Sequence, residues 1–186
     1  TNVSCNGGVD GSIEITVSGG TEDYSYLWSK ITDGSGLDSL LGDQSGLGPG
    51  TYKVVVTDAN DCTIEKLFII TQPDALSIID SLTNITCNGD NDGSINITVS
   101  GGTEDYSYLW SRITDGSGLD SAAGNQSGLG PGTYKVVVTD ANGCTIEDTF
   151  NITQPDELLI SLDTTTNKNL LCYGDSTSII TNITQE

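Results

Sequence analysis

The chain has 186 residues, and 26 acidic against 6 basic side chains give it a formal net charge of −20. This charge disfavours nucleic-acid partners and anionic membrane surfaces, because both select Lys and Arg. The sequence contains no His, so neither a Ser-His-Asp nor a Cys-His catalytic system can be built, and we expect no enzymatic activity. No apolar run approaches the ~20 residues of a membrane span, so we expect no membrane insertion.

The sequence repeats itself at an offset of 82 residues. The residue pairs that keep this offset include Cys5 and Cys87, Trp28 and Trp110, Pro49 and Pro131, Cys62 and Cys144, and Pro73 and Pro155. We expect one domain over 1–73, a second over 74–155, and the start of a third, partial repeat over 156–186. Such tandem copies are typical of stalks, filaments and multivalent binders, because length and valency grow by adding units. We expect the chain to be a segment of a longer protein.

Each unit is predicted to consist of short strands separated by turns rich in Gly, Asp and Asn. In the first unit apolar and polar residues alternate over Ser12–Ser18, which predicts a half-buried strand. Two further apolar stripes follow, one over Tyr24–Trp28 and one over Tyr52–Val56. The Thr57–Asp61 segment is typical of a hairpin turn and leads into a last strand over Cys62–Ile70.

Two antiparallel sheets packed face to face would bury these stripes, and no segment has sustained helical periodicity. A Trp on the third strand and a Tyr after Pro-Gly, near the start of the sixth, are typical of an immunoglobulin-like sandwich. The Leu47–Tyr52 segment lies where a tyrosine corner would form. We therefore predict an all-β fold of tandem immunoglobulin-like β-sandwich repeats that form an extended rod. We interpret four aromatic residues as core rather than as a surface platform for sugars: Trp28, Tyr52, Trp110 and Tyr134.

The joints between units are predicted at Gln72–Asp74 and Gln154–Asp156. Proline cannot donate to a sheet ladder, so it ends the last strand and stiffens the connection. The residues that follow the first joint are apolar at Leu76, Ile78 and Ile79. We expect this linker to form the first strand of the next unit.

An ordered set of motifs recurs in both units, from Cys5 to Pro73 and from Cys87 to Pro155. It consists of Cys-Asn-Gly, Asp-Gly-Ser-Ile, Val-Ser-Gly-Gly, Tyr-Ser-Tyr-x-Trp, Gly-Pro-Gly-Thr-Tyr, Val-Thr-Asp-Ala-Asn-x-Cys and Thr-Gln-Pro. This set closely resembles the SprB-type repeat of very large surface proteins of gliding Bacteroidota. The resemblance implies type IX secretion and display on the cell surface of a Gram-negative bacterium. The third copy keeps the opening Cys172–Asp175 but lacks the Asp-Gly-Ser-Ile that should follow.

The resemblance implies a structural and adhesive repeat segment of a surface filament, linked to attachment and gliding motility. The expected partners are further copies of the same repeat in the same chain, extracellular surfaces or polysaccharide, and motility machinery contacted through other regions. An alternative is a carbohydrate-binding repeat array on a secreted enzyme, which would require an exposed, concave aromatic platform. We expect no cofactor apart from a possible calcium ion.

Five cysteines, two in each complete unit and one in the partial unit, predict disulfides in an exported protein: Cys5, Cys62, Cys87, Cys144 and Cys172. Pairing inside each unit would join Cys5 to Cys62 and Cys87 to Cys144. A sandwich would place those partners at opposite ends, roughly 25–33 Å apart at ~3.3 Å per residue, whereas a disulfide needs Cα atoms within about 7 Å. Units stacked head to tail would instead bring Cys5 near Cys144, and Cys62 and Cys87 would then pair outside this segment. Both pairings remain open from the sequence.

Two further kinds of site are suggested by short motifs. Asn88, Asp90 and Asp92 resemble the start of an oxygen-ligand calcium loop, although the later bidentate Glu is missing and a turn is the favoured interpretation. No other metal ligands are predicted. Asp followed by Ser or Thr and a small or aliphatic residue resembles the O-glycosylation motif of exported Bacteroidota proteins, and the candidates are Ser39, Ser81, Ser121, Thr164 and Ser176.

Overall fold

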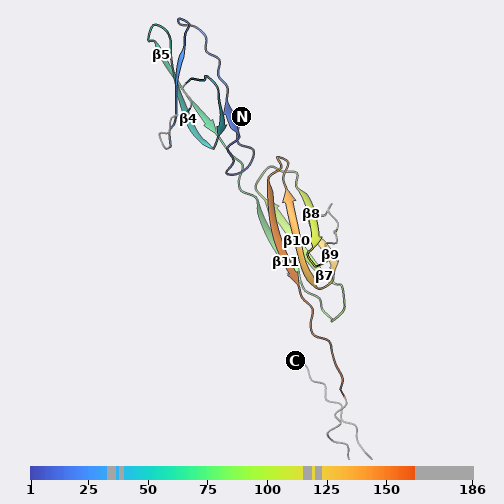
Figure 1. Cartoon of the computed structure of the whole chain (residues 1–186). Helices are drawn as coiled ribbons and strands as arrows, with labels where there is room; N and C mark the ends of the chain where they lie inside the picture. Colours follow the sequence, from blue (N-terminus) through green and yellow to red (C-terminus); the bar gives the residue numbers. More distant parts are fainter. Residues whose placement is uncertain (33–36, 38–39, 115–118, 120–122, 162–186) are drawn as a thin grey trace, which may run out of the picture.

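The computed structural model describes residues 1–32, 37, 40–114, 119 and 123–161, and in these residues it contains strands and turns but no helix. Figure 1 shows the strands in two groups, β1–β5 and β6–β11, which meet where the chain enters β6. The strands are β1 (Gly11–Ile13), β2 (Ser25–Lys30), β3 (Gln44–Leu47), β4 (Gly50–Thr57), β5 (Thr63–Ile70), β6 (Ser77–Thr83), β7 (Gly93–Ser100), β8 (Ser107–Arg112), β9 (Gln126–Leu129), β10 (Gly132–Thr139) and β11 (Thr145–Ile152).

The second unit is a sandwich of two three-stranded antiparallel sheets. One sheet has the order β6-β7-β9 and the other the order β11-β10-β8. Numbered along the unit, strands one, two and four form one sheet, and strands three, five and six form the other. This is the strand arrangement of an immunoglobulin-like sandwich. Some consecutive strands pair within one sheet, and others are joined by a connection that crosses to the other sheet. The predicted all-β, immunoglobulin-like fold is therefore confirmed.

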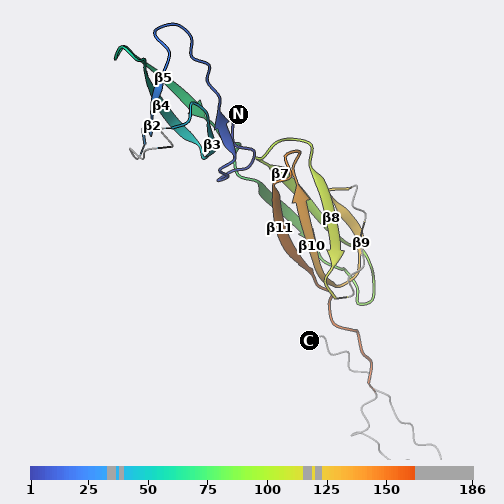
Figure 2. The same cartoon turned by 45° about the horizontal axis from the view of Figure 1, so that its top comes forward.

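The linker after Pro73 is part of the second sandwich. The segment Ser77–Thr83 forms β6 and pairs along its whole length with β7, in the register that places Ile78 opposite Val99. Figure 2 shows the chain passing from the first unit directly into the sandwich that contains β7 and β11. The expectation that the linker forms the first strand of the next unit is confirmed.

The first unit has the same plan with one strand fewer among the described residues. Its sheets are β2-β4-β5 and β1-β3. The predicted strand over Ser12–Ser18 was wrong in extent, because only Gly11–Ile13 forms β1, whereas the corresponding β7 spans Gly93–Ser100. The physical reason is pairing: β7 lies between β6 and β9, while β1 pairs only with β3 in the described part of the chain.

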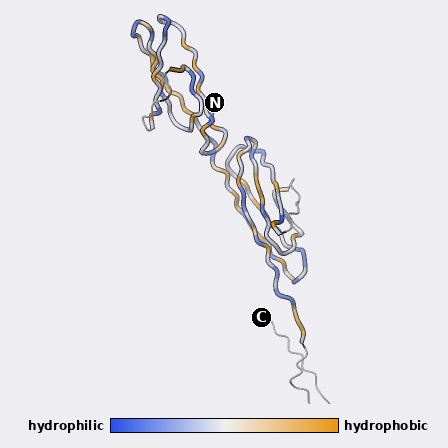
Figure 3. Tube along the Cα trace, in the orientation of Figure 1, coloured by the Kyte–Doolittle hydropathy of each residue, from blue (hydrophilic) through white to orange (hydrophobic). Residues whose placement is uncertain are grey.

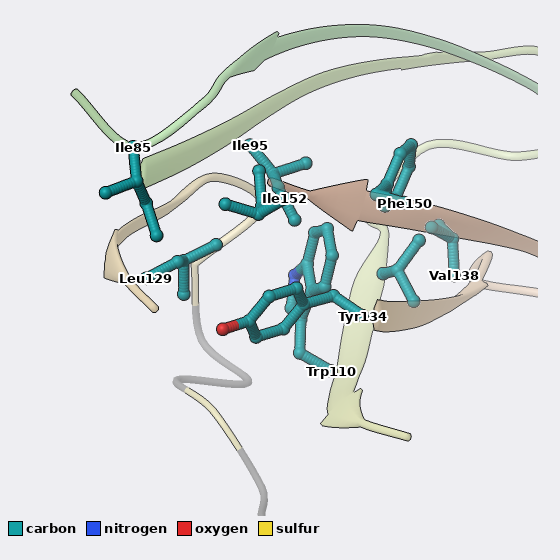
Figure 4. Close-up of a cluster of buried hydrophobic side chains, with 9 residues drawn as sticks. Ile85, Ile95, Trp110, Leu129, Tyr134, Val138, Phe150 and Ile152 are labelled. Carbon is teal, nitrogen blue, oxygen red and sulfur yellow. The ribbon is translucent and has the colours of Figure 1, made fainter. Parts of the chain in front are cut away.

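Each sandwich is closed around a tryptophan, Trp28 on β2 and Trp110 on β8. Trp110 and Trp28 are both 1% exposed, and each ring contacts a phenylalanine of the last strand. The ring centroids of Trp110 and Phe150 lie 5.7 Å apart, and those of Trp28 and Phe68 lie 5.8 Å apart. Figure 4 shows Trp110 at the centre of the second core, beside Tyr134. The buried core of this unit consists of Ile85, Ile95, Trp110, Leu129, Tyr134, Val136, Val138, Phe150 and Ile152.

Alternation along β10 explains why this strand carries much of the core. Tyr134, Val136 and Val138 are buried, and the residues between them are half-buried, as expected for a strand with one face inward. The hydropathy of the chain alternates in the same way along the strands in Figure 3. The interpretation of the two Trp and two corner Tyr residues as core is confirmed, since Tyr52 and Tyr134 are 1% and 2% exposed.

The predicted tyrosine corner is present in both units. The hydroxyl of Tyr134 donates to the carbonyl oxygen of Gly130 at 2.8 Å, and Tyr52 donates to Gly48 at 2.8 Å. Each bond ties the start of a strand, β4 in the first unit and β10 in the second, to the loop that precedes it. A buried hydroxyl is thereby satisfied, which removes the penalty of placing a polar group in the core.

We predict that Tyr134→Phe lowers the free energy of unfolding of the second unit by about 1 kcal/mol, because it removes one buried hydrogen bond but keeps the ring. Urea denaturation should give a lower midpoint with an unchanged slope. The matched variant Tyr52→Phe should cost the first unit a similar amount. An unchanged midpoint in both variants would contradict a structural role for the corner.

Candidate functional site

The candidate functional site is the region where the two units meet, called the joint below. It comprises the Ser4–Cys5 loop, the linker Asp74–Leu76, the Gly101–Gly102 turn and the Asp140–Cys144 turn. A disulfide joins Cys5 of the first unit to Cys144 of the second, with Cα atoms 5.7 Å apart. Residues of all four segments, including both cysteines of the disulfide, line a cleft of about 470 Å³.

The disulfide decides between the two pairings that the sequence left open. Cys5 lies in the loop before β1, and Cys144 lies directly before β11, after the turn that follows β10. The pairing is therefore between units, at a sequence separation of 139. Their repeat counterparts, Cys87 and Cys62, are free and exposed. Cys172 lies outside the described residues.

The turn that carries Cys144 is organised by the carboxylate of Asp140, which is 5% exposed. One oxygen, Oδ1, accepts hydrogen bonds from the backbone N–H groups of Asn142 (2.9 Å) and Cys144 (2.8 Å). The other, Oδ2, accepts from the backbone N–H of Thr103 (2.9 Å). These hydrogen bonds hold the turn in its conformation and attach it to the loop at Gly101–Gly102. Cys144 is presented by a rigid segment rather than by a free loop.

Hydrogen bonding sets the ionisation of this group. Burial acts to raise the pKa of Asp140, but the backbone hydrogen bonds from Thr103, Cys144 and Asn142 outweigh it and hold the pKa below its ordinary value. The corresponding Asp58 has a lowered pKa because the backbone N–H groups of Thr21 and Cys62 donate to it. Both turns therefore carry a charged carboxylate at neutral pH.

The loop that carries Cys5 is held by a second carboxylate. The backbone N–H of Ser4 donates to Oδ1 of Asp10 at 3.0 Å, and the Ser4 hydroxyl donates to Oδ2. The hydroxyl contact, followed by the backbone contact, lowers the pKa of Asp10. Within the loop, the N–H of Gly8 donates to the carbonyl oxygen of Cys5 at 2.9 Å. The geometry of the first cysteine is therefore also fixed locally.

The same loop is attached to the end of its own unit. The side-chain amide of Asn6 donates to the carbonyl oxygen of Pro73 at 3.0 Å, and the N–H of Gly7 donates to the side-chain oxygen of Gln72 at 2.8 Å. These bonds explain why Cys-Asn-Gly and Thr-Gln-Pro recur together. They place Cys5 beside the point where the chain leaves the first unit.

The linker lies directly on the Gly101–Gly102 turn. The N–H of Gly102 donates to the carbonyl oxygen of Asp74 at 2.8 Å. A Cβ atom at Gly101 would lie only 2.0 Å from the carbonyl oxygen of Ala75, and one at Gly102 would lie 2.8 Å from Cδ2 of Leu76. Both glycines have positive φ values, +79° and +63°. Gly101 is required because the backbone of Ala75 approaches too closely for any side chain, and a Cβ at Gly102 would meet the side chains of Asp140 and Leu76.

One further hydrogen bond crosses the joint beside the disulfide. The side-chain amide of Asn142 donates to the carbonyl oxygen of Ser4 at 3.1 Å and also to the hydroxyl of Thr103 at 2.9 Å. Sequence reasoning identified the cysteines of the joint but not Asp140, Asn142 or the glycine pair. The available signal was that these residues recur at the same offset of 82, at Asp58, Asn60 and Gly19–Gly20.

Two of the three calcium candidates, Asn88 and Asp92, have side chains with local structural roles. The amide of Asn88 donates to the carbonyl oxygen of Pro155 at 3.0 Å, as Asn6 does at Pro73. Asp92 accepts from the hydroxyl and N–H of Thr86 at 2.5 and 3.2 Å, and the hydroxyl contact, followed by the backbone one, lowers its pKa. Asp90 is exposed. In the described part of the chain, no group of three His, Cys, Asp or Glu side chains could hold a metal ion.

Of the O-glycosylation candidates, Ser81 lies on β6 and is exposed. The remaining candidates, Ser39, Ser121, Thr164 and Ser176, lie outside the described residues. A search of the described residues for helices long and apolar enough to cross a membrane finds none.

Comparison with known protein families gives one match. The family model described as the SprB repeat matches residues 1–33 and 79–115, which are the opening parts of the two units. The resemblance to the SprB repeat is confirmed. The matched segments contain the disulfide partner Cys5, its counterpart Cys87 and the glycine pair at Gly101. No curated protein matches the chain.

Solved structures with a similar course of the chain include multidomain immunoglobulin proteins. The amphioxus IgVJ-C2 molecule is 12% identical, with 83% of this chain and 99% of that chain covered and a TM-score of 0.39. The four N-terminal immunoglobulin domains of Dscam1 isoform 6.9 are 13% identical, with a TM-score of 0.37. That match covers 82% of this chain and 42% of the Dscam1 chain.

We predict that peptide mapping without reduction yields a Cys5–Cys144 peptide. Reduction should lower the free energy of unfolding by up to about 5 kcal/mol in the chain-entropy model, because the bridge closes a very long loop. Cys144→Ser should reproduce the effect of reduction, whereas the matched variant Cys62→Ser should leave the free energy of unfolding unchanged. A Cys5–Cys62 peptide would contradict a disulfide between the two units.

We also predict that the joint weakens in acid. The folded pKa of Asp140 lies below the unfolded one, so its stabilisation is complete above about pH 4 and is lost as pH falls through the folded pKa. Asp140→Asn should therefore reduce the loss of thermal stability between neutral and acidic pH. Glu147→Gln, which alters a carboxylate paired with Lys135 on the surface, is the control. If thermal stability depended on pH in the same way in wild type and Asp140→Asn, the carboxylate of Asp140 would not stabilise the joint.

Proposed function

We propose that the chain is a structural and adhesive repeat segment of a large bacterial surface filament, in which the joints transmit tension. The observation that carries this proposal is the disulfide between consecutive units, Cys5–Cys144. A linker alone connects two units through a single strand of backbone. Here a second covalent connection runs beside the linker, and such a pair of connections opposes bending and twisting at the joint. This supports an extended rod.

The position of the bridge also determines how a pull would pass through the chain. Tension that reaches Cys5 crosses to Cys144 and continues along β11 to Pro155. The residues between the two cysteines lie outside this covalent path, so unfolding of their strands cannot lengthen the chain after the bridge forms. A filament built in this way would keep its length under force, which suits transmission from a motor to an attachment point.

The disulfide supports an extracellular location, because such bonds persist in oxidising compartments and are rare in the bacterial cytosol. The SprB repeat match supports display on the surface of a Gram-negative cell after type IX secretion. We propose gliding machinery, contacted through other regions, as the source of force. Sugar on the exposed Ser81 would fit the same setting.

Attachment through many weak contacts with surfaces or polysaccharide is the adhesive part of the proposal, and repetition of units would supply the valency. The alternative of a carbohydrate-binding array depended on an exposed aromatic platform. The aromatic residues considered for it, Trp28, Tyr52, Trp110 and Tyr134, are at most 2% exposed. We therefore do not favour it, and we propose no enzymatic activity for this segment.

We predict that the disulfide limits extension in single-molecule force spectroscopy. With handles at the two ends, the reduced chain should lengthen on unfolding by roughly 460–500 Å more than the oxidised chain. This difference is the fully extended length of the chain between the two cysteines, whose sequence separation is 139. Cys144→Ser should behave as the reduced chain under oxidising conditions, and Cys62→Ser should behave as wild type. Equal extension with and without the bridge would refute the proposed path of tension.

A further inference from the structure

The sequence contains three Asn-Gly pairs, and the structure places all of them in loops outside the strands. They are Asn6–Gly7, Asn88–Gly89 and Asn142–Gly143, and all six residues are exposed to water. An Asn followed by Gly is especially prone to deamidation, because no Cβ atom shields the glycine nitrogen from the asparagine side chain. Each pair is therefore a position at which the chain could modify itself.

The pair at Asn88 is held within its own unit. The side-chain amide of Asn88 donates to the carbonyl oxygen of Pro155 at 3.0 Å, and the N–H of Gly89 donates to Oε1 of Gln154 at 3.1 Å. Both groups that would react, the side-chain amide and the glycine N–H, are thus engaged where the chain leaves the second unit. The pair at Asn6 is held in the same way at the end of the first unit.

The pair at Asn142 is held by the joint instead. Its side-chain amide donates across the joint to the carbonyl oxygen of Ser4 at 3.1 Å. The N–H of Gly143 donates to the carbonyl oxygen of Asp140 at 3.0 Å. The next residue, Cys144, is anchored to the first unit by the disulfide. To reach Cγ of Asn142, the Gly143 nitrogen must rotate out of the turn, and the closed joint opposes this movement on both sides of Gly143.

The corresponding turn of the first unit separates the contribution of the turn from that of the joint. The side-chain amide of Asn60 donates to the hydroxyl of Thr21 at 2.7 Å. This is the bond that Asn142 makes with Thr103 at 2.9 Å, so it belongs to the turn, whereas the second bond of Asn142 crosses the joint. Asn60 is followed by Asp61 and not by Gly, so the first unit has the same turn without the reactive pair.

We propose that Asn142 is a self-modification site that the closed joint protects. When the joint opens, Asn142 deamidates to aspartate or isoaspartate, and the product keeps the joint from closing in its original form. A carboxylate has no N–H to donate to the carbonyl oxygen of Ser4, and it places a negative charge against that oxygen. The hydroxyl of Thr103 can donate to the new carboxylate, so the turn itself keeps its bond. The proposal rests on the geometry of the joint and not on adhesion.

The reaction requires only water and a base. The Gly143 nitrogen gives its proton to hydroxide or a buffer base and attacks Cγ of Asn142, which forms a new C–N bond. The Cγ–Nδ2 bond then breaks, and Nδ2 takes up a proton and leaves as ammonia, so that a cyclic succinimide remains. Water opens this ring at Cγ to give aspartate, or at the main-chain carbonyl carbon to give isoaspartate. The net change converts an amide and water into a carboxylic acid and ammonia, with no oxidation or reduction.

The test incubates the full chain at mildly alkaline pH and follows Asn142 and Asn88 by peptide mapping, which resolves Asn, Asp and isoaspartate. Cys5→Ser removes the disulfide and leaves the sequence around Asn142 unchanged. It should speed deamidation of Asn142 roughly fivefold or more, since the loss of one hydrogen bond shifts an opening equilibrium by about that factor. Asn88, which is held within its own unit, should keep its rate. Equal rates at Asn142 in both proteins, or a parallel rise at Asn88, would overturn the proposal.

A matched pair of substitutions tests the effect of the product. Asn142→Asp introduces the carboxylate that deamidation forms, and Asn60→Asp introduces the same group in the corresponding turn of the first unit. In a glutathione redox buffer, Asn142→Asp should lower the equilibrium constant for forming the Cys5–Cys144 bond roughly fivefold, because one hydrogen bond across the joint is lost. Asn60→Asp should keep the wild-type constant, and circular dichroism can verify that both variants are folded. Equal constants for the two variants would overturn the proposed effect on the joint.

Discussion

The second unit depends on the chain that leads into it. The linker backbone lies in direct contact with Gly101 and Gly102 and then continues as β6, the edge strand of the sandwich. The close approach leaves no space for a Cβ atom, so the position of the preceding unit is set by backbone contact. A change at the joint therefore acts on both the connection and the core of the unit that follows.

The disulfide adds a second constraint at the same place. A long cross-link between distant residues has a large entropic effect on the unfolded chain, but its geometry is possible only where two segments already meet. Asp10 and Asp140 fix the two loops that carry Cys5 and Cys144. Both carboxylates accept several hydrogen bonds in the charged form, which explains why these short polar turns can hold the cysteines at bonding distance.

The two units show how one sequence acquires two environments. Asp58 and Asp140 accept the same hydrogen bonds within nearly identical turns, and among the described residues the turn at Asp140 meets another unit while the turn at Asp58 does not. Ile64 and Ile146 occupy the same strand position, yet only Ile146 is covered. The differences lie in the neighbours and not in the residues themselves. They identify the surfaces that belong to the joint.

The sequence by itself determined the elements and the core. Period-two alternation placed the strands at Tyr52–Val56 and its copy, and the Pro-Gly-Thr-Tyr motif placed the tyrosine corner, because both are local consequences of backbone geometry and side-chain burial. The tertiary structure decided how far the strand at Ser12 extends, because strand length depends on a pairing partner. It also decided the disulfide, because the choice between Cys62 and Cys144 as partner of Cys5 depends on which ends of two units come together in space.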